Sequence, residues 1–387
     1  MTGAKRTGAE RGRVSDEPRP TDAGRVGGNR GLAGAEQEGE ERADSGTDGV
    51  RAGVERDEAT RRDSNALAAA AENPRARFLF VSGSRVAVEP GAERVLALSA
   101  GCVAPEARRR AVYLGLVDGA PYFACDVGDA DDSARDPRLV SRAIPAASRP
   151  AAVAEGDERA WSVSADFASV PLTSHLWPSV EAELAVEAVA ISNWIGGTRF
   201  CHRCGEPLTL RSGGWEMVCG RGHTVFPRVD PAVIMAVRDA EDRLLLARNG
   251  RWAPGRLSVL AGFVEAGEPL ESAVAREVLE ETGVVVDDVA YVTSQPWPFP
   301  RSLMLAFEGR TRARQEDVKV DGEELVFARF FSREEFSGAL ASGEIGLPTP
   351  TSVSARLIER WLGPTAGRLK VFSRPALFRR SGLRAAD

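Results

Sequence analysis

The sequence predicts an α+β protein with more than one folded domain. Its 387 residues are enough for two or three domains, and 43% hydrophobic content is ordinary for a globular chain. Short strand-like runs and a few helical patterns follow one another without a regular alternation. We expect a strand-rich α+β domain over residues 77–193, a small metal-binding ribbon over 194–228 and a second α+β domain over 229–365.

The two ends of the chain differ in composition from the middle. Residues 1–76 contain no aromatic residue and few large aliphatic ones, so we expect a disordered extension. Residues 366–387 form a basic tail. The net charge of -6 argues against a general nucleic-acid binder.

The first folded domain contains short apolar runs separated by Gly, Pro and Asp. We expect strands at Phe78–Val81, Val95–Leu98 and Val112–Leu116. Apolar residues between Val180 and Trp194 recur with a helical period, which predicts an amphipathic helix leading into the cysteines.

The second domain contains five strand-like runs and two helices. The strands are expected at 232–237, 243–247, 289–293, 303–309 and 326–331, and a last helix at 351–362. The other helix should run from Pro269 to Thr282, because proline is tolerated in the first turn and Gly283 can supply a left-handed last residue.

This second-domain helix carries an unusual group of charges. Glu277 and Glu281 are four residues apart on one face, with Glu280 beside them, so they should repel one another. Magnesium would relieve this repulsion, because it prefers a few carboxylate ligands and keeps positions open for water and phosphates. Arg276 could pair with Glu268 and hold the preceding loop. The alternative is a solvated acidic face.

The chain has five cysteines, which in a protein expected to be cytoplasmic suit a metal ion better than disulfides. Two cysteines separated by two residues can face one tetrahedral ion, and a hairpin through Gly213 and Gly214 would bring up a second pair. The predicted zinc ligands are Cys201, Cys204, Cys219 and His223. His202 or a water molecule is the alternative fourth ligand. Cys102 and Cys125 have no partner spacing and receive no role.

Three prolines alternate with two aromatic rings between Ser294 and Met304. Because proline fixes φ, such a loop would present its rings in a set arrangement to a planar ligand. The residues of this candidate substrate loop are Gln295, Pro296, Trp297, Pro298, Phe299, Pro300, Arg301 and Ser302. Alternatively, Trp297 and Phe299 fill the core.

The stretch Gly262-x5-Glu268-x7-Arg276-Glu277-Val278-x-Glu280-Glu281-x-Gly283-Val284 resembles the signature of the Nudix hydrolases. The resemblance implies an α/β/α sandwich with a mixed sheet. It also implies attack of water on a diphosphate with Mg2+ or Mn2+, in which Glu280 or Glu281 positions the water.

The cysteines and the proline-rich loop are similar to those of one subfamily, the NADH pyrophosphatases. That subfamily places a zinc ribbon before the catalytic domain, usually with a cysteine as the fourth ligand where this sequence has His223. The implied reaction converts NADH or NAD+ to AMP and nicotinamide mononucleotide, and a homodimer is expected.

Further site residues follow from this resemblance. Metal ligation is implied for Glu277, Glu281, the carbonyl of Ala261 and Glu324, with Glu323 as the near alternative to Glu324. Phe226 and Ser354 match positions that line the nucleotide site. Phe327 stands where relatives often carry another glutamate.

No apolar run is long enough to span a membrane, and the N-terminus lacks the apolar core of a secretory signal, so a cytoplasmic protein is expected. Two other functions compete with hydrolysis of free NADH. The same site could remove NAD caps from RNA, for which the basic stretch 368–384 offers weak support. The protein could also be a binding module that senses a nucleotide without cleaving it.

Overall fold

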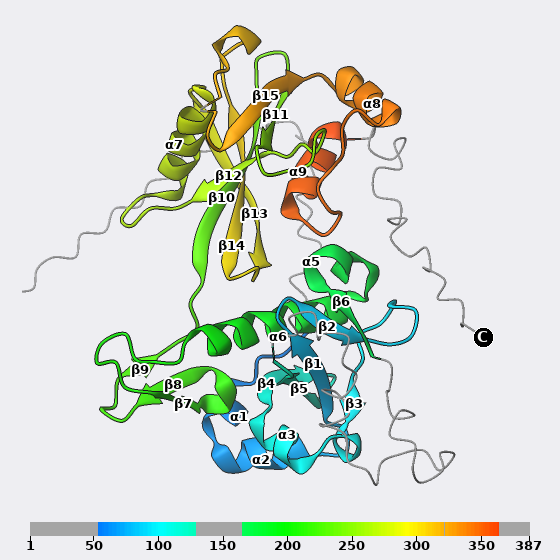
Figure 1. The fold of residues 1–387 in the computed structure, drawn as a ribbon, viewed down its shortest axis with the longest axis vertical. Coiled ribbons are helices and arrows are strands. Elements are labelled where there is room, and N and C mark those ends of the chain that lie inside the picture. Colours follow the sequence, from blue (N-terminus) through cyan, green and yellow to red (C-terminus); the bar gives the residue numbers. More distant parts are fainter. Residues whose placement is uncertain (1–52, 129–164, 321, 364–387) are drawn as a thin grey trace, which may run out of the picture. The chain divides into compact units, whose positions relative to one another are not determined.

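The computed structural model describes residues 53–128, 165–320 and 322–363, shown in Figure 1. Its N-terminal sheet has the strand order β4-β5-β1-β2-β6, and β3 also pairs with β1. These strands are β1 (Arg77–Ser82), β2 (Arg85–Val88), β3 (Leu98–Ser99), β4 (Val112–Val117), β5 (Ala120–Asp126) and β6 (Asp166–Ser169). The expected strand at 95–98 is therefore shorter and begins later.

The C-terminal sheet has the order β13-β14-β10-β11-β15, and β12 also pairs with β10. These strands are β10 (Asp230–Arg238), β11 (Leu244–Asn249), β12 (Leu260–Phe263), β13 (Asp288–Trp297), β14 (Ser302–Arg310) and β15 (Leu325–Phe331). Strands β10 and β14 are parallel and the other pairs antiparallel, so the expected mixed sheet is confirmed.

The two sheets share one topology. Each has a single parallel pair, β1 with β5 and β10 with β14, at the same place in the strand order. They differ in the helix that precedes the edge strand. In the first domain this is α3 (Pro105–Arg110), which ends in three arginines, and in the second it is the acidic helix α7 (Leu270–Thr282). Only the second copy therefore carries the clustered carboxylates.

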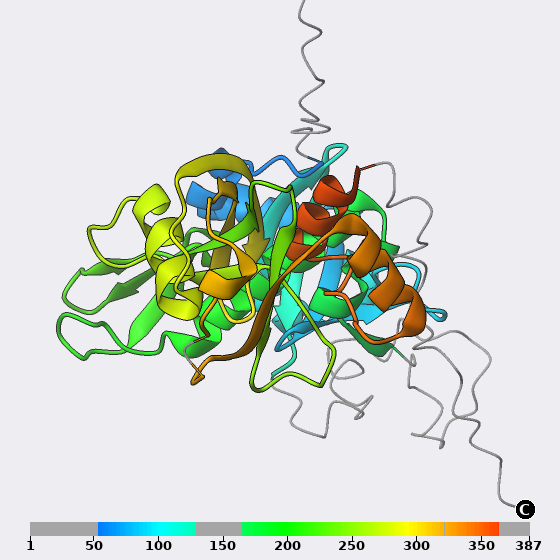
Figure 2. The same ribbon diagram turned by 90° about the horizontal axis from the view of Figure 1, so that it is seen from above.

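Side-chain alternation along β10 explains the layers of the second domain. Val233, Met235 and Val237 pack with the buried side of α7, whereas Ile234 and Ala236 pack with α9 (Val353–Leu362). Figures 1 and 2 show these two helices on opposite faces of the sheet. The α/β/α sandwich is thus confirmed.

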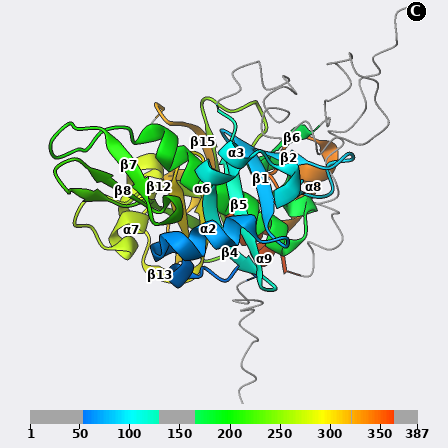
Figure 3. The ribbon, with the colours of Figure 1, turned by 90° about the horizontal axis from the view of Figure 1, so that it is seen from below.

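The first domain is built in the same way. Along β1, Leu79 and Val81 pack with α6 (Ser179–Gly197), whereas Phe78 and Phe80 face α2 (Ser64–Glu72) and α3. Figure 3 shows the sheet from the side of α2 and α3. The elements α5 (Val170–Thr173) and α1 (Glu58–Arg62) complete this domain.

The expectation of disorder through residue 76 is wrong for its last part. Residues 53–76 contain α1 and α2, and α2 packs Leu67 and two alanines against the aromatic side chains of the sheet. Val54 is also buried in the core. The small side chains of α2 are sufficient to hold this helix on the sheet, because Phe78 and Phe80 supply the apolar surface that they pack against. Residues 1–52 and the basic tail from 364 onwards lie outside the described residues.

Between the domains in sequence lies a three-stranded ribbon, β7 (Leu208–Arg211), β8 (Glu216–Cys219) and β9 (Thr224–Val225). Its first hairpin turns at Ser212–Gly214, where Gly213 and Gly214 both have positive φ. The predicted glycine turn is therefore confirmed.

Three features of the second domain differ from the sequence prediction, and the first is strand β12, which was not anticipated. The stretch expected as a loop between Ser294 and Met304 is mostly a hairpin, in which Trp297 pairs with Ser302. Pro296 is tolerated because β13 is an edge strand, where a missing N–H need break no ladder bond. Helix α8 (Arg333–Ser342) was not anticipated. None of the helices in the described ranges has the length and apolarity needed to cross a membrane.

Candidate functional site

Helix α7 presents its carboxylates from a fixed position. Ala273, Val274 and Val278 are buried against the sheet. The helix ends at Gly283, whose φ is 69° and whose N–H donates to the carbonyl of Leu279. Its predicted bounds are therefore confirmed to within one residue, and the turns that carry the three glutamates cannot rotate without exposing the apolar stripe.

The carboxyl group of Glu277 is held between α7 and β12. A β-carbon on Gly262 would lie 1.8 Å from its carboxyl carbon, so the absence of a side chain at 262 makes room for it. Burial raises the pKa of Glu277, the charge of Arg276 opposes this, and the nearby carboxylates of Glu280 and Glu324 add to the rise. The carboxylates of Glu277 and Glu280 on α7 and the carboxylate of Glu324 thus lie close enough to interact electrostatically.

Arg276 binds the preceding loop, as predicted. Its Nε donates to Oε1 of Glu268 over 2.8 Å and its Nη2 to Oε2 over 2.9 Å, and Nη2 also donates to the carbonyl of Phe263 over 2.9 Å. The hydrogen bond from Arg276 lowers the pKa of Glu268. The same guanidinium lies 3.0 Å from Glu277 and 3.2 Å from Glu280. It therefore fixes the loop and offsets part of the carboxylate charge.

A pocket of ≈ 300 Å³ opens beside these groups. It brings together residues from β12, α7, β13, α9 and the segment just before β15 that the sequence assigned to metal or substrate. These are Ala261, Glu281, Gln295, Trp297, Glu324 and Ser354. Glu323, the alternative to Glu324, is exposed and lies outside this lining.

The other predicted substrate residues lie elsewhere. Phe226 is exposed, and Arg301 pairs with Asp230 at 2.6 Å. Phe299 stacks edge-on against Trp297 at 5.1 Å but packs against the core of the first domain. Pro296, Pro298, Pro300 and Ser302 do not line the pocket. Phe327, which stands where relatives often carry another glutamate, is 37% exposed.

Two of the pocket residues also hold the wall together. The Gln295 amide donates to the carbonyl of Thr351 over 2.7 Å and accepts from the N–H of Val353 over 2.6 Å, so it fixes the start of α9 on β13. The hydroxyls of Ser258 and Ser354 are 2.7 Å apart and buried. These bonds give the pocket a preformed shape.

Among the pocket residues that sequence reasoning missed are Asn249, Trp252 and Arg256. The Asn249 amide donates to the Glu324 carboxylate over 3.3 Å, which orients that group. The sequence did contain a signal, because an asparagine at the end of an apolar strand and a tryptophan in the following loop are typical of sites at strand ends.

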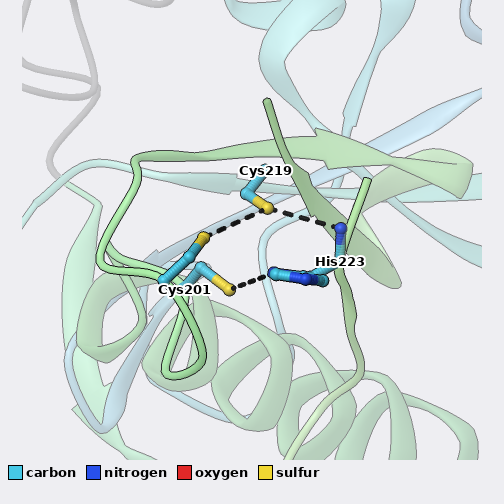
Figure 4. Close-up of side chains that lie close together, drawn as sticks. Cys201, Cys219 and His223 are labelled. Atoms are coloured by element: carbon cyan, nitrogen blue, oxygen red, sulfur yellow. Dashed lines mark hydrogen bonds between the residues drawn. The ribbon is translucent and has the colours of Figure 1, made fainter. Parts of the chain in front are cut away.

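The predicted zinc ligands come together in the ribbon, and Figure 4 shows three of them, Cys201, Cys219 and His223. The ligand atoms of Cys201, Cys204, Cys219 and His223 all lie within 4.8 Å of one another. The Cys201 sulfur is 3.5 Å from Nδ1 of His223, and the sulfurs of Cys204 and Cys219 are 3.7 Å apart. Ligands 2.3 Å from one tetrahedral ion would be about 3.8 Å apart, so the four atoms fit such an ion.

The surroundings of the cluster favour thiolates. Burial raises the pKa of Cys201, but backbone N–H groups of Arg203 and Cys204 and the side chain of His223 outweigh it, giving a pKa of about 6. His202, the alternative ligand, is exposed and lies outside the group. A group of three sulfurs and one nitrogen could hold a metal ion such as zinc.

Comparison with known proteins agrees with this architecture. Residues 228–348 match the family model described as the NUDIX domain, and residues 75–194 match the NADH pyrophosphatase-like rudimentary NUDIX domain. The second match covers the domain whose sheet repeats the topology of the catalytic one.

Among similar proteins is the NAD-capped RNA hydrolase NudC of Mycobacterium bovis, 37% identical over 304 residues, which are 76% of this chain and 88% of that protein. The NAD-capped RNA hydrolase NUDT12 of Macaca fascicularis is 38% identical over 195 residues, 47% of this chain and 42% of that protein. A crystal structure of a NUDIX hydrolase from Nitrosomonas europaea aligns with a TM-score of 0.35 at 20% identity, covering 42% of this chain and 90% of that one. The chain belongs to the Nudix hydrolase family, in its NADH pyrophosphatase subfamily.

Proposed function

We propose that the protein hydrolyses the diphosphate bond of NADH or NAD+, releasing AMP and reduced or oxidised nicotinamide mononucleotide. The observation that carries this proposal is the pocket itself, in which the ring of Trp297 and the carboxylates of Glu281 and Glu324 share one lining. An aromatic ring suits a nicotinamide or adenine base, and carboxylates suit the metal that a diphosphate requires.

The donor set fits magnesium or manganese. Glu277, Glu281 and Glu324 provide carboxylate oxygens and Ala261 a backbone carbonyl, all hard ligands of the kind that Mg2+ accepts. When bound, the metal neutralises the diphosphate and lowers the pKa of a coordinated water. The chain's own part is to hold these oxygens in place through Gly262 and Asn249.

The role of positioning the attacking water is assigned to Glu281 rather than Glu280. Glu281 is buried and lines the pocket, whereas the Glu280 side chain is 59% exposed and pairs with Arg276. A group that orients the attacking water must lie within hydrogen-bond reach of that water, which stands beside the diphosphate in the pocket, and this favours the pocket residue.

The ribbon would hold structural zinc. Its four ligands leave no open position, so the ion contributes to stability and takes no part in the chemistry. The ion would also join the segment before β7, which holds Cys201 and Cys204, to the turn between β8 and β9. We further expect a homodimer in the cytoplasm, which sedimentation and cell fractionation can test.

A second substrate is favoured by the relatives, because both named proteins are NAD-capped RNA hydrolases. An NAD cap presents the same diphosphate as free NAD+, so the same carboxylates and pocket would serve. The sensing function is the remaining rival, and it predicts nucleotide binding without products.

The direct test compares Glu281→Gln with Glu271→Gln, an exposed glutamate on the same helix that does not line the pocket. We expect Glu281→Gln to lose most NADH hydrolysis while keeping the fold and zinc content, and Glu271→Gln to keep the parent rate. Full activity in Glu281→Gln, or parent activity without a divalent cation, would contradict the metal assignment.

A further inference from the structure

The loop between β11 and β12 adds a cationic group to the pocket. Trp252 and Arg256 both line it, and the Arg256 guanidinium lies 5.2 Å from the centre of the Trp252 ring. The lining contains two carboxylates, Glu281 and Glu324, and Arg256 is its only cationic side chain among the described residues. One wall of the pocket therefore attracts metal and another attracts anions.

The loop is held in place by backbone contacts. The N–H of Gly346 donates to the carbonyl of Gly255 over 2.9 Å, and the N–H of Leu257 donates back to Gly346 over 3.1 Å. Gly255 has a φ of 80°, and a β-carbon there would lie 2.5 Å from the carbonyl oxygen of Glu344. The position of Arg256 is thus fixed by the segment between α8 and α9.

Arg256 lies where the pocket meets a second depression. Arg256 and Thr349 line both, and the second, of ≈ 410 Å³, is the more open. Its walls include Pro254, Ile345 and Leu347, with Glu344 beside them. The residues that follow Arg256, Leu257 and Ser258, are buried, so Arg256 stands at the mouth of the catalytic pocket.

The charge of Arg256 is available to a ligand. Its side chain is exposed and has no carboxylate partner in the part of the chain that the structure describes. Arg276 and Arg301, by contrast, are paired with Glu268 and Asp230. A guanidinium stacked on an aromatic ring and free of carboxylates is well suited to a phosphate next to a base.

A pocket of this volume is at the small end of the range for ligand sites and takes one nucleotide, so the other nucleotide of a dinucleotide lies at the mouth. We propose that Arg256 binds the phosphate on the ribose of that outer nucleotide, the 3′-phosphodiester that joins an NAD cap to an RNA chain. The depression beside it then takes the next nucleotide. The Glu344 carboxylate disfavours a second phosphate there, so a sugar or base occupies that end.

This inference rests on the proposed hydrolysis of NAD-type diphosphates and adds the residue that would contact the RNA part of a capped substrate. Free NAD+ has no phosphate at this position, whereas capped RNA has one. The charge of Arg256 should therefore affect capped RNA more than free NAD+.

The test measures kcat/KM of Arg256→Gln for NAD-capped RNA and for free NAD+. The matched control is Arg251→Gln, an exposed arginine of the same loop that lines neither cavity. We expect the loss of kcat/KM in Arg256→Gln to be roughly tenfold greater on capped RNA than on NAD+, as for one charge-assisted hydrogen bond. The slope of log kcat/KM against log salt for capped RNA should also weaken by about 0.7.

Equal losses on the two substrates would place Arg256 on the shared diphosphate and overturn the inference, as would an unchanged rate on both. An effect of Arg251→Gln equal to that of Arg256→Gln would also overturn it, because any positive charge nearby would then suffice. If the parent protein cleaves neither substrate, the proposed function itself fails, which is a distinct result.

Discussion

The carboxyl group of Glu277 occupies the space that a side chain at Gly262 would fill, with 1.8 Å between its carboxyl carbon and an ideal β-carbon there. A glycine on β12 and a glutamate on α7 therefore form one unit. Since Glu277 is the flexible end of a side chain, it can move away if the space is lost, and the fold would survive.

Gly262→Ala should consequently affect activity more than stability. The added methyl group displaces the Glu277 carboxylate, and a misplacement of about 1 Å can cost roughly 100-fold in rate. We expect kcat for NADH to fall by about that factor, with the thermal midpoint nearly unchanged. Gly338→Ala is the control, because a β-carbon there meets nothing within 4 Å. A normal rate in Gly262→Ala would show that the position of Glu277 is unimportant.

The two rings of the hairpin should behave differently when removed. Trp297 lines the pocket, so Trp297→Ala should raise KM for NADH roughly tenfold, as stacking of a base on an aromatic side chain contributes about 1–3 kcal/mol. Phe299 packs against the first-domain core, so Phe299→Ala should instead lower the unfolding free energy by roughly 1–3 kcal/mol. Steady-state kinetics and denaturant unfolding separate these effects. The assignment fails if KM is unchanged in Trp297→Ala.

Zinc content should depend on His223 and not on His202. His223→Ala removes one of four ligands, so we expect less than one zinc per chain and a lower thermal midpoint. His202→Ala alters an exposed side chain outside the cluster and should retain the full content. His223→Cys should retain it too, because a thiolate also ligates zinc. Atomic absorption measures the zinc content of the purified variants. Zinc loss in His202→Ala would show that His202, not His223, is the fourth ligand.

Glu187 gives stability a pH dependence. It is buried on α6 beside Arg56, and burial raises its pKa to about 7 despite that arginine. A carboxyl group with a raised pKa in the folded state holds its proton longer than in the unfolded chain, so its contribution to stability decreases as pH rises from about 4.5 to 7.

The Glu187→Gln variant should lack this decrease. We expect its unfolding free energy to change less between pH 5 and pH 8 than that of the parent protein, measured by chemical denaturation. Glu183→Gln, a partly exposed neighbour on the same helix, serves as the control. Parallel pH profiles for Glu187→Gln and the parent would contradict the raised pKa.

Local signals in the sequence were enough to predict α7 and the cysteine cluster. The bounds of α7 follow from a buried stripe and from Pro269 and Gly283, which act within a few residues. The ligand spacing of Cys201 and Cys204 is likewise a local property. Such features need little help from distant parts of the chain.

The features that were missed depend on distant contacts. Helix α2 has few large side chains and is stabilised by the aromatic residues of β1. The stretch that contains Pro296 was predicted as a loop, but the edge position of β13 allows it to form a strand. Arg256 reaches the pocket only because Gly346, ninety residues later, holds its loop. Burial, edge position and loop contacts of this kind cannot be read from neighbouring residues.

The most direct test of the proposed chemistry identifies the products formed from NAD+ with magnesium by chromatography. Hydrolysis of the diphosphate predicts AMP and nicotinamide mononucleotide in equal amounts, and neither product from Glu281→Gln. Release of nicotinamide and ADP-ribose, or thermal stabilisation of the protein by NAD+ without any product, would contradict it.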